Sequence, residues 1–185
     1  NSDDLYLPGA VSAAVRAFER HPEAGLVYAD VVSIDGAGQA TNVMTFADWG
    51  LDDLLQFNII SQPGVFIRRS LLAQTGFLNP NFHYLLDHHL WLRAARLAPI
   101  HYVRERWAAA RFHPGAKNVN QAPGFGREAD RLVSWLAAQP EFQPEWRRLE
   151  TRIRAGADRM NGRYLLDGGL PRQALARYLR GLLRC

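Results

Sequence analysis

The residues best suited to chemistry are three aspartates at two points of the chain. Asp3 and Asp4 stand near its beginning, and Asp87 opens a strongly helical run, residues 87–97. Adjacent carboxylates can hold a hard divalent cation, Mg²⁺ or Mn²⁺, on a diphosphate leaving group. A lone carboxylate can take a proton from an attacking hydroxyl group. Together, the three residues could serve group transfer from a diphosphate donor.

Each aspartate also has a structural interpretation. Asp3 and Asp4 could cap the helix that Pro8 opens, and Asp87 could be the N-cap of its own helix. A capping carboxylate can also act as a base, so capping does not exclude the chemistry of Asp87.

Histidines near Asp87 are weak candidates for a metal site. His88 and His89 are adjacent, and adjacent side chains on a helix point about 100° apart, so the two would rarely share an ion. No cysteine stands at zinc-ligand spacing from His83. His113 falls in a later loop. It could be a metal ligand or, equally, an ordinary loop histidine.

Three further side chains could bind a ligand. Gln62 precedes Pro63 in an extended segment, where its amide group could form a hydrogen bond with a ligand. Arg68 could meet a phosphate group or be an ordinary charge at a strand end. Trp91 follows Asp87 by one helical turn, and it could stack on a ligand ring or pack in the core.

The elements that must position these residues follow from apolar periodicity. Helices are predicted at residues 9–20, 51–57, 70–74, 87–97, 127–138, 143–166 and 171–184. Strands are predicted at 25–34, 59–68, 100–104 and 107–112, with a turn at Asp35-Gly36. Ser70 is the expected cap and Gly76 the expected end of the third helix. This order predicts an α/β domain over residues 1–118 and a helical tail over 119–185.

Composition restricts the class of protein. The chain has 185 residues, of which 48% are hydrophobic and 22% charged, as is usual for a soluble domain. No stretch approaches the roughly 18 apolar residues of a membrane span, and the acidic start is unlike a signal peptide. The single cysteine, Cys185, excludes an intrachain disulfide. A cytoplasmic location is expected.

The positive charge is concentrated in the helical tail. Lys+Arg exceeds Asp+Glu by 22 − 18 = 4 charges, and arginines crowd the last forty residues. Such a tail could contact an acidic partner or a membrane surface, self-associate, or be a solvated helix face. Its aromatic residues have the helical spacing of packing residues, so nucleic acid is not an expected partner.

Short motifs occur in the order found in one known family. They are Asn1-Ser2-Asp3-Asp4, Gln62-Pro63, Phe66-Ile67-Arg68-Arg69, Gly76-Phe77-Leu78, the run from Asp87 through Arg93, and Arg111-Phe112-His113. In this order the chain resembles family-2 glycosyltransferases of the GT-A fold over roughly residues 1–117. The resemblance implies a partial GT-A domain that begins at the metal-binding motif, with the nucleotide-binding half absent and a helical extension at the other end.

The resemblance also implies roles for the candidate residues. Asp87 would be the catalytic base, and Asp3 with His113 would hold Mg²⁺ or Mn²⁺. The donor- and acceptor-binding residues would be Asp4, Gln62, Trp91 and Arg68. The chain departs from the family where Asn1 replaces the first acid of the motif, and where Leu86 and His89 replace acids beside the base.

The implied reaction is inverting transfer of a sugar from a nucleotide-sugar donor to a saccharide or lipid-linked acceptor. Processive synthases of the family carry Gln-x-x-Arg-Trp, whereas Val103 stands in the Gln position before Arg106-Trp107, so the expected enzyme is non-processive. The isolated chain is expected to be inactive, peripheral at the inner face of the membrane, and able to form a homo-oligomer. The alternative is a non-catalytic helical module that binds an acidic partner or itself.

Overall fold

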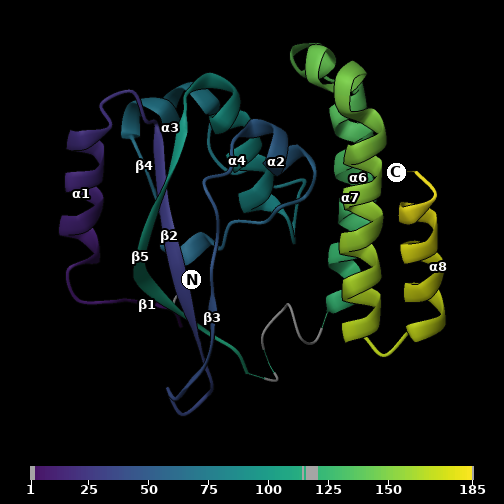
Figure 1. Cartoon of the computed structure of the whole chain (residues 1–185), viewed down its shortest axis with the longest axis horizontal. Helices are drawn as coiled ribbons and strands as arrows, with labels where there is room; N and C mark the ends of the chain where they lie inside the picture. Colours follow the sequence, from purple (N-terminus) through teal and green to yellow (C-terminus); the bar gives the residue numbers. More distant parts are fainter. Residues whose placement is uncertain (1–2, 114, 116–120, 185) are drawn as a thin grey trace. The chain divides into compact units, whose positions relative to one another are not determined.

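The computed structural model describes residues 3–113, 115 and 121–184 (Figure 1). Its contacts divide the chain into two compact units. We call them the sheet unit, which comprises Asn1–Leu51, Ile59–Leu78 and Leu90–His113, and the helical unit, which comprises Asp52–Asn58, Asn79–His89 and Pro114–Cys185. Asn1, Ser2 and Cys185, which the sequence analysis singled out, lie outside the described residues.

The sheet unit is built around a mixed sheet. Its described strands are β1 (Leu5–Tyr6), β2 (Leu26–Ile34), β3 (Ala40–Met44), β4 (Val65–Ile67) and β5 (Ile100–Arg111), in the order β1-β5-β2-β3 with β4 also paired to β2. β2 runs parallel to β5 and antiparallel to β3 and β4. An almost continuous apolar sequence suits β2 to this central position, because both its faces are covered.

Helix α1 (Ala10–Arg20) packs on the sheet through small residues. Ala10, Ala13, Ala14 and Ala17 are buried and form a cluster with Val27, Ala29 and Trp107. Alanine at each contact lets the helix approach the strands closely. The remaining helices that enter this unit are α3 (Arg69–Thr75) and the second part of α4 (Leu86–Leu97).

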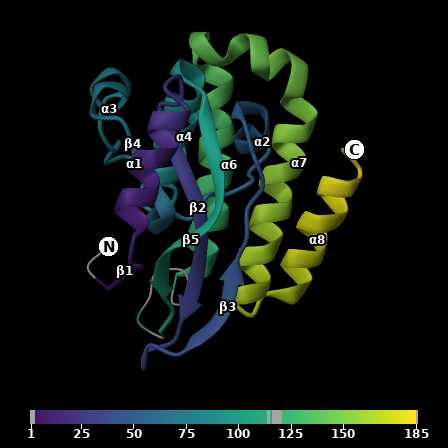
Figure 2. The same cartoon turned by 60° about the vertical axis from the view of Figure 1, so that its left-hand side comes forward.

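The helical unit consists mainly of three helices that follow one another along the chain. They are α6 (Ala122–Ala138), α7 (Gln143–Asp167) and α8 (Pro171–Leu182), with a 3-10 turn at Pro140–Phe142 before α7. α7 packs against both α6 and α8, which lie on either side of it (Figure 2). The unit also contains most of α2 (Leu51–Leu55) and the first residues of α4. No described helix has both the length and the apolar character that crossing a bilayer requires.

The structure confirms the mixed α/β class and most of the predicted helices. Three local predictions were wrong, and strand β3 was not predicted. Residues 100–111 form one strand, because β5 absorbs a register shift between Val103 and Arg106. The strand predicted at 59–68 is reduced to β4, since Gln62–Gly64 forms a 3-10 turn around Pro63. α3 begins at Arg69 rather than at a Ser70 cap, and it has no side-chain cap.

Candidate functional site

Arg111 organises the acidic corner of the sheet unit. Its backbone N–H donates to Asp4 Oδ1 at 3.0 Å, and its Nε donates to the Asp3 carbonyl at 3.3 Å. Its Nη1 donates to the carbonyls of Asp35 and Gly36, at 2.9 and 3.2 Å. One arginine at the end of β5 therefore joins the start of the chain to the turn after β2.

Asp3 and His113 meet at this corner. The Asp3 Oδ2 lies 3.4 Å from the His113 Nε2, and both side chains are partly exposed. Neighbouring ligands of an octahedral Mg²⁺ or Mn²⁺, each at about 2.1 Å from the ion, would be about 3 Å apart. The observed separation is that of a hydrogen-bonded ion pair, and it is also close to the separation of two adjacent ligands of such a cation. Among residues 3–113, 115 and 121–184, no group of three or more acidic, histidine or cysteine side chains is arranged to hold a metal, so other ligands would have to complete this set.

Asp87 lies in the first turn of α4, in the helical unit. Its Oδ1 accepts the backbone N–H of His88 at 2.7 Å. Burial raises the pKa of the Asp87 carboxyl to about 6, against the backbone hydrogen bonds, and the charge of Glu128 adds to the increase. Part of the residue remains open to solvent. A carboxyl group with a pKa near neutrality, at an accessible helix start, is suited to proton transfer.

Glu128 holds the turn that leads into Asp87. This buried glutamate of α6, which is 6% exposed, accepts the backbone N–H groups of His83 at 2.7 Å, Tyr84, and Leu85 at 2.6 Å. Three consecutive donors directed at one carboxylate fix the backbone two residues ahead of Asp87. Glu128 was not predicted as a site residue from the sequence. Its signal is an acid on the same helix face as the apolar Leu132.

The two histidines that follow Asp87 pack inside the protein. His88 is fully buried, its Nε2 lies 3.1 Å from the Leu54 carbonyl, and burial lowers the pKa of its imidazole to about 4. His89 stacks on Phe82 with ring centroids 4.3 Å apart. The two imidazoles contact different groups, as adjacent residues on a helix do.

The other predicted binding residues lie in the sheet unit. Gln62 begins the 3-10 turn before β4 and is partly exposed. Arg68 donates to the carbonyls of Ala24 at 2.7 Å and Phe18 at 3.0 Å, and it covers the Phe18 ring. Arg68 thus ties the end of α1 to β4. Trp91 is buried in α4, which favours its alternative role as a core residue.

The structure therefore brings Asp3, Asp4 and His113 together in the sheet unit. It places Asp87 with Glu128 in the helical unit.

Comparison with known proteins identifies a relative but no activity. No protein-family model matches the chain. Over 133 residues, which are 70% of this chain, the sequence is 30% identical to the "Uncharacterized protein y4gI" of Sinorhizobium fredii (strain NBRC 101917 / NGR234). The chain spans 14% of the length of that protein.

Proposed function

We propose that the chain supplies catalytic groups for inverting, non-processive transfer of a sugar from a nucleotide-sugar donor to a saccharide or lipid-linked acceptor. The observation that carries this proposal is the Asp87 carboxyl, whose pKa is raised to about 6 at the accessible start of α4. The sequence around it has the order of motifs found in family-2 glycosyltransferases.

In this proposal Asp87 is the general base. The acceptor hydroxyl oxygen forms a bond to the anomeric carbon as the bond from that carbon to the diphosphate oxygen breaks. The electron pair of the broken bond leaves with the diphosphate, and the hydroxyl proton passes to Asp87. The hydrogen bond from the His88 N–H favours the ionised carboxylate, and Glu128 keeps the preceding turn in place.

Asp3 and His113 are the residues that would hold the cofactor, Mg²⁺ or Mn²⁺. The bound cation would neutralise the charge that develops on the diphosphate. Arg111 keeps Asp3 at this corner through the Asp3 carbonyl, and it occupies Asp4 Oδ1 through its own backbone N–H. Asp4 would bind the donor at the same corner.

Substitution of Asp87 tests the proposal. The variant is assayed for sugar transfer in the full-length protein. There Asp87→Asn is expected to lower kcat by about 10²- to 10⁴-fold, the usual contribution of a general base. The dissociation constant of the donor should stay the same. Asp167→Asn, at the end of α7, is the matched control and should keep full activity. Retained turnover in Asp87→Asn, or loss of donor binding, would contradict the role of Asp87.

The alternative function is a non-catalytic helical module. The leucines that α8 leaves exposed favour this second candidate. If binding by α8 is the sole function, neither Asp87→Asn nor Asp3→Asn would alter the activity of the whole protein.

A further inference from the structure

Charged groups on α8 help to attach this helix to the helical unit. Asp158 of α7 is buried and accepts hydrogen bonds from Arg177 at 3.1 Å, from Arg180, and from Arg184 at 3.0 Å. Arg177 also pairs with Asp130 of α6. The inward face of α8 is therefore fixed by ion pairs, by the small residues Ala174 and Gly181, and by the Tyr178 ring against Gly162, without its leucines.

The leucines of α8 form a stripe on the opposite face. Leu175, Leu179, Leu182 and Leu183 are 58%, 51%, 71% and 90% exposed. Their spacing places them along one side of the helix. We call these four residues the leucine stripe. Because the fold does not use them for packing, their apolar surface is available to a partner.

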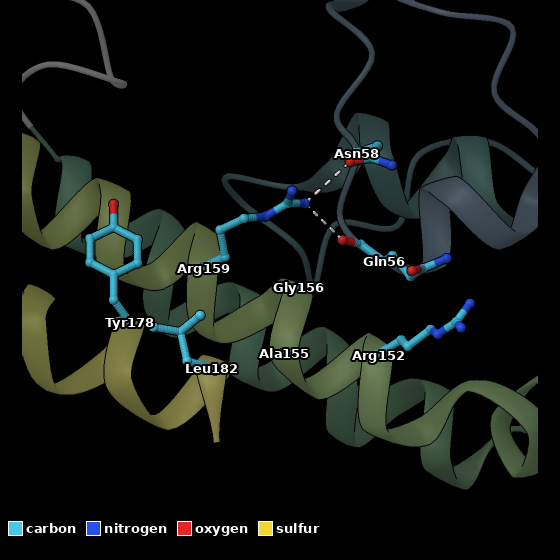
Figure 3. A pocket seen from close by; sticks show the side chains of 9 residues that line it. Gln56, Asn58, Arg152, Ala155, Gly156, Arg159, Tyr178 and Leu182 are labelled. Carbon is cyan, nitrogen blue, oxygen red and sulfur yellow. Dashed lines mark hydrogen bonds between the residues drawn. The ribbon is translucent and has the colours of Figure 1, made fainter. Parts of the chain in front are cut away.

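A pocket adjoins the leucine stripe at Leu182. It encloses about 580 Å³, and its walls come from α7, from α8 and from the segment after α2. Figure 3 shows Arg152 and Arg159 on α7, and Leu182 on α8. Arg159 donates to the Gln56 carbonyl at 3.0 Å and to Asn58 Oδ1 at 3.2 Å. The pocket thus combines two guanidinium groups with an apolar edge.

We propose that the leucine stripe and the adjoining pocket dock the helical unit on an anionic lipid surface. The leucines would enter the headgroup layer, and Arg152 and Arg159 would contact a lipid phosphate. Exposed leucines on one face of a helix, beside the guanidinium groups of Arg152 and Arg159, are a combination typical of surfaces that lie in a membrane interface. Lipid docking would hold whether or not the protein transfers sugar.

Charge favours lipid over the other partners. Arg177, Arg180 and Arg184 are paired with Asp158, but Arg152 and Arg159 beside Leu182 and Arg172 at the start of α8 are exposed cations. Two copies of this face would bring these cations together, whereas an anionic headgroup layer would attract them. Nucleic acid would engage the arginines, but it would leave the leucine stripe in water.

Flotation with lipid vesicles tests the proposal. The 185-residue chain should float with vesicles of equal parts phosphatidylcholine and phosphatidylglycerol, and much less with phosphatidylcholine alone. The double substitution Leu179→Asp and Leu182→Asp should reduce binding to the anionic vesicles by about 10-fold or more, because it places charge where apolar surface must insert. Arg152→Gln should weaken binding to anionic vesicles alone.

Two controls keep the test decisive. Leu97→Asp changes a comparably exposed leucine of α4, 55% exposed, and should leave binding unchanged. The melting temperature of each variant should equal that of the original chain, since none of the substituted side chains is buried. Absence of flotation, or equal flotation of the double variant, would overturn the proposal. So would a dimer that the double variant dissociates, or binding of free glycerol phosphate without binding of vesicles.

Discussion

The backbone N–H of His88 donates a hydrogen bond of 2.7 Å to the Oδ1 of Asp87. The pKa values of these two neighbouring side chains are shifted in opposite directions. Burial raises the pKa of the Asp87 carboxyl to about 6 and lowers the pKa of the His88 imidazole to about 4. Both shifts disfavour charge at the start of α4. Their effects on stability oppose each other between the two pKa values.

Asp87→Asn should stabilise the protein at neutral pH. A carboxyl whose pKa is raised from 3.8 to about 6 contributes stability below about pH 4, which is lost as the pH rises through 6. The amide removes the buried charge and can still accept the His88 N–H. We expect a gain of about 1–2 kcal/mol at neutral pH and none near pH 4. Urea denaturation at both pH values measures it.

The same variant should reveal how the protonation of His88 changes stability with pH. A histidine whose pKa is lowered to about 4 contributes stability above its ordinary value of 6.5, which is lost as the pH falls through 4. In the original chain Asp87 offsets this loss. Asp87→Asn should therefore lose stability more steeply on acidification, whereas Asp167→Asn should follow the original chain. Parallel curves for all three proteins would show that Asp87 is not desolvated.

Glu128→Ala should destabilise the helical unit strongly. It leaves three backbone N–H groups, those of His83, Tyr84 and Leu85, without their buried acceptor, which should cost about 2–4 kcal/mol. Glu128→Gln should cost less, and it should lower the pKa of Asp87 because the charge of Glu128 raises it. Denaturation measures the first effect, and a carboxyl NMR titration of Asp87 measures the second.

An exposed glutamate provides the matched control for Glu128. Glu150 pairs with Arg154 on the surface of α7, and Glu150→Gln should change stability by less than about 0.5 kcal/mol. Equal effects of Glu128→Ala and Glu150→Gln would show that the turn before Asp87 does not need its acceptor.

Gly156→Ala should destabilise the protein although alanine favours helices. A Cβ at position 156 would overlap the carbonyl oxygen of Gln56. The strain should cost about 1–3 kcal/mol, more than the roughly 1 kcal/mol that helix propensity returns. Gly36→Ala is the control, because a Cβ there would meet nothing within 4 Å. A stabilised Gly156→Ala variant would refute the close contact between α7 and Gln56.

The elements with strong periodicity could be predicted from the sequence. α1 buries alanines that recur at helical spacing, and β2 is a short apolar run rich in β-branched residues. β3 could not be predicted, because Ala40–Met44 is largely exposed and is ordered by pairing with β2 after the Asp35 turn. The two strands predicted within β5 were separated by polar residues that the register shift accommodates.

Site residues could be predicted from the sequence only where their neighbours in the chain indicate their role. Asp87 stands out because a carboxylate opens an apolar helix. Glu128 does not, since its partners are backbone groups up to 45 residues away in the chain. The approach of Asp3 to His113 is likewise a property of the ends of β1 and β5, and it was predicted through the resemblance rather than from the spacing of the two residues.

The pH dependence of sugar transfer is the most direct test of Asp87 as the base. With donor and acceptor saturating, kcat should rise with pH through a midpoint of about 6, as the carboxyl ionises. Glu128→Gln should move that midpoint to lower pH, and Asp87→Asn should abolish the rise together with most of the activity. An Asp87→Asn enzyme that keeps the original rate and the original midpoint would show that another group takes the proton.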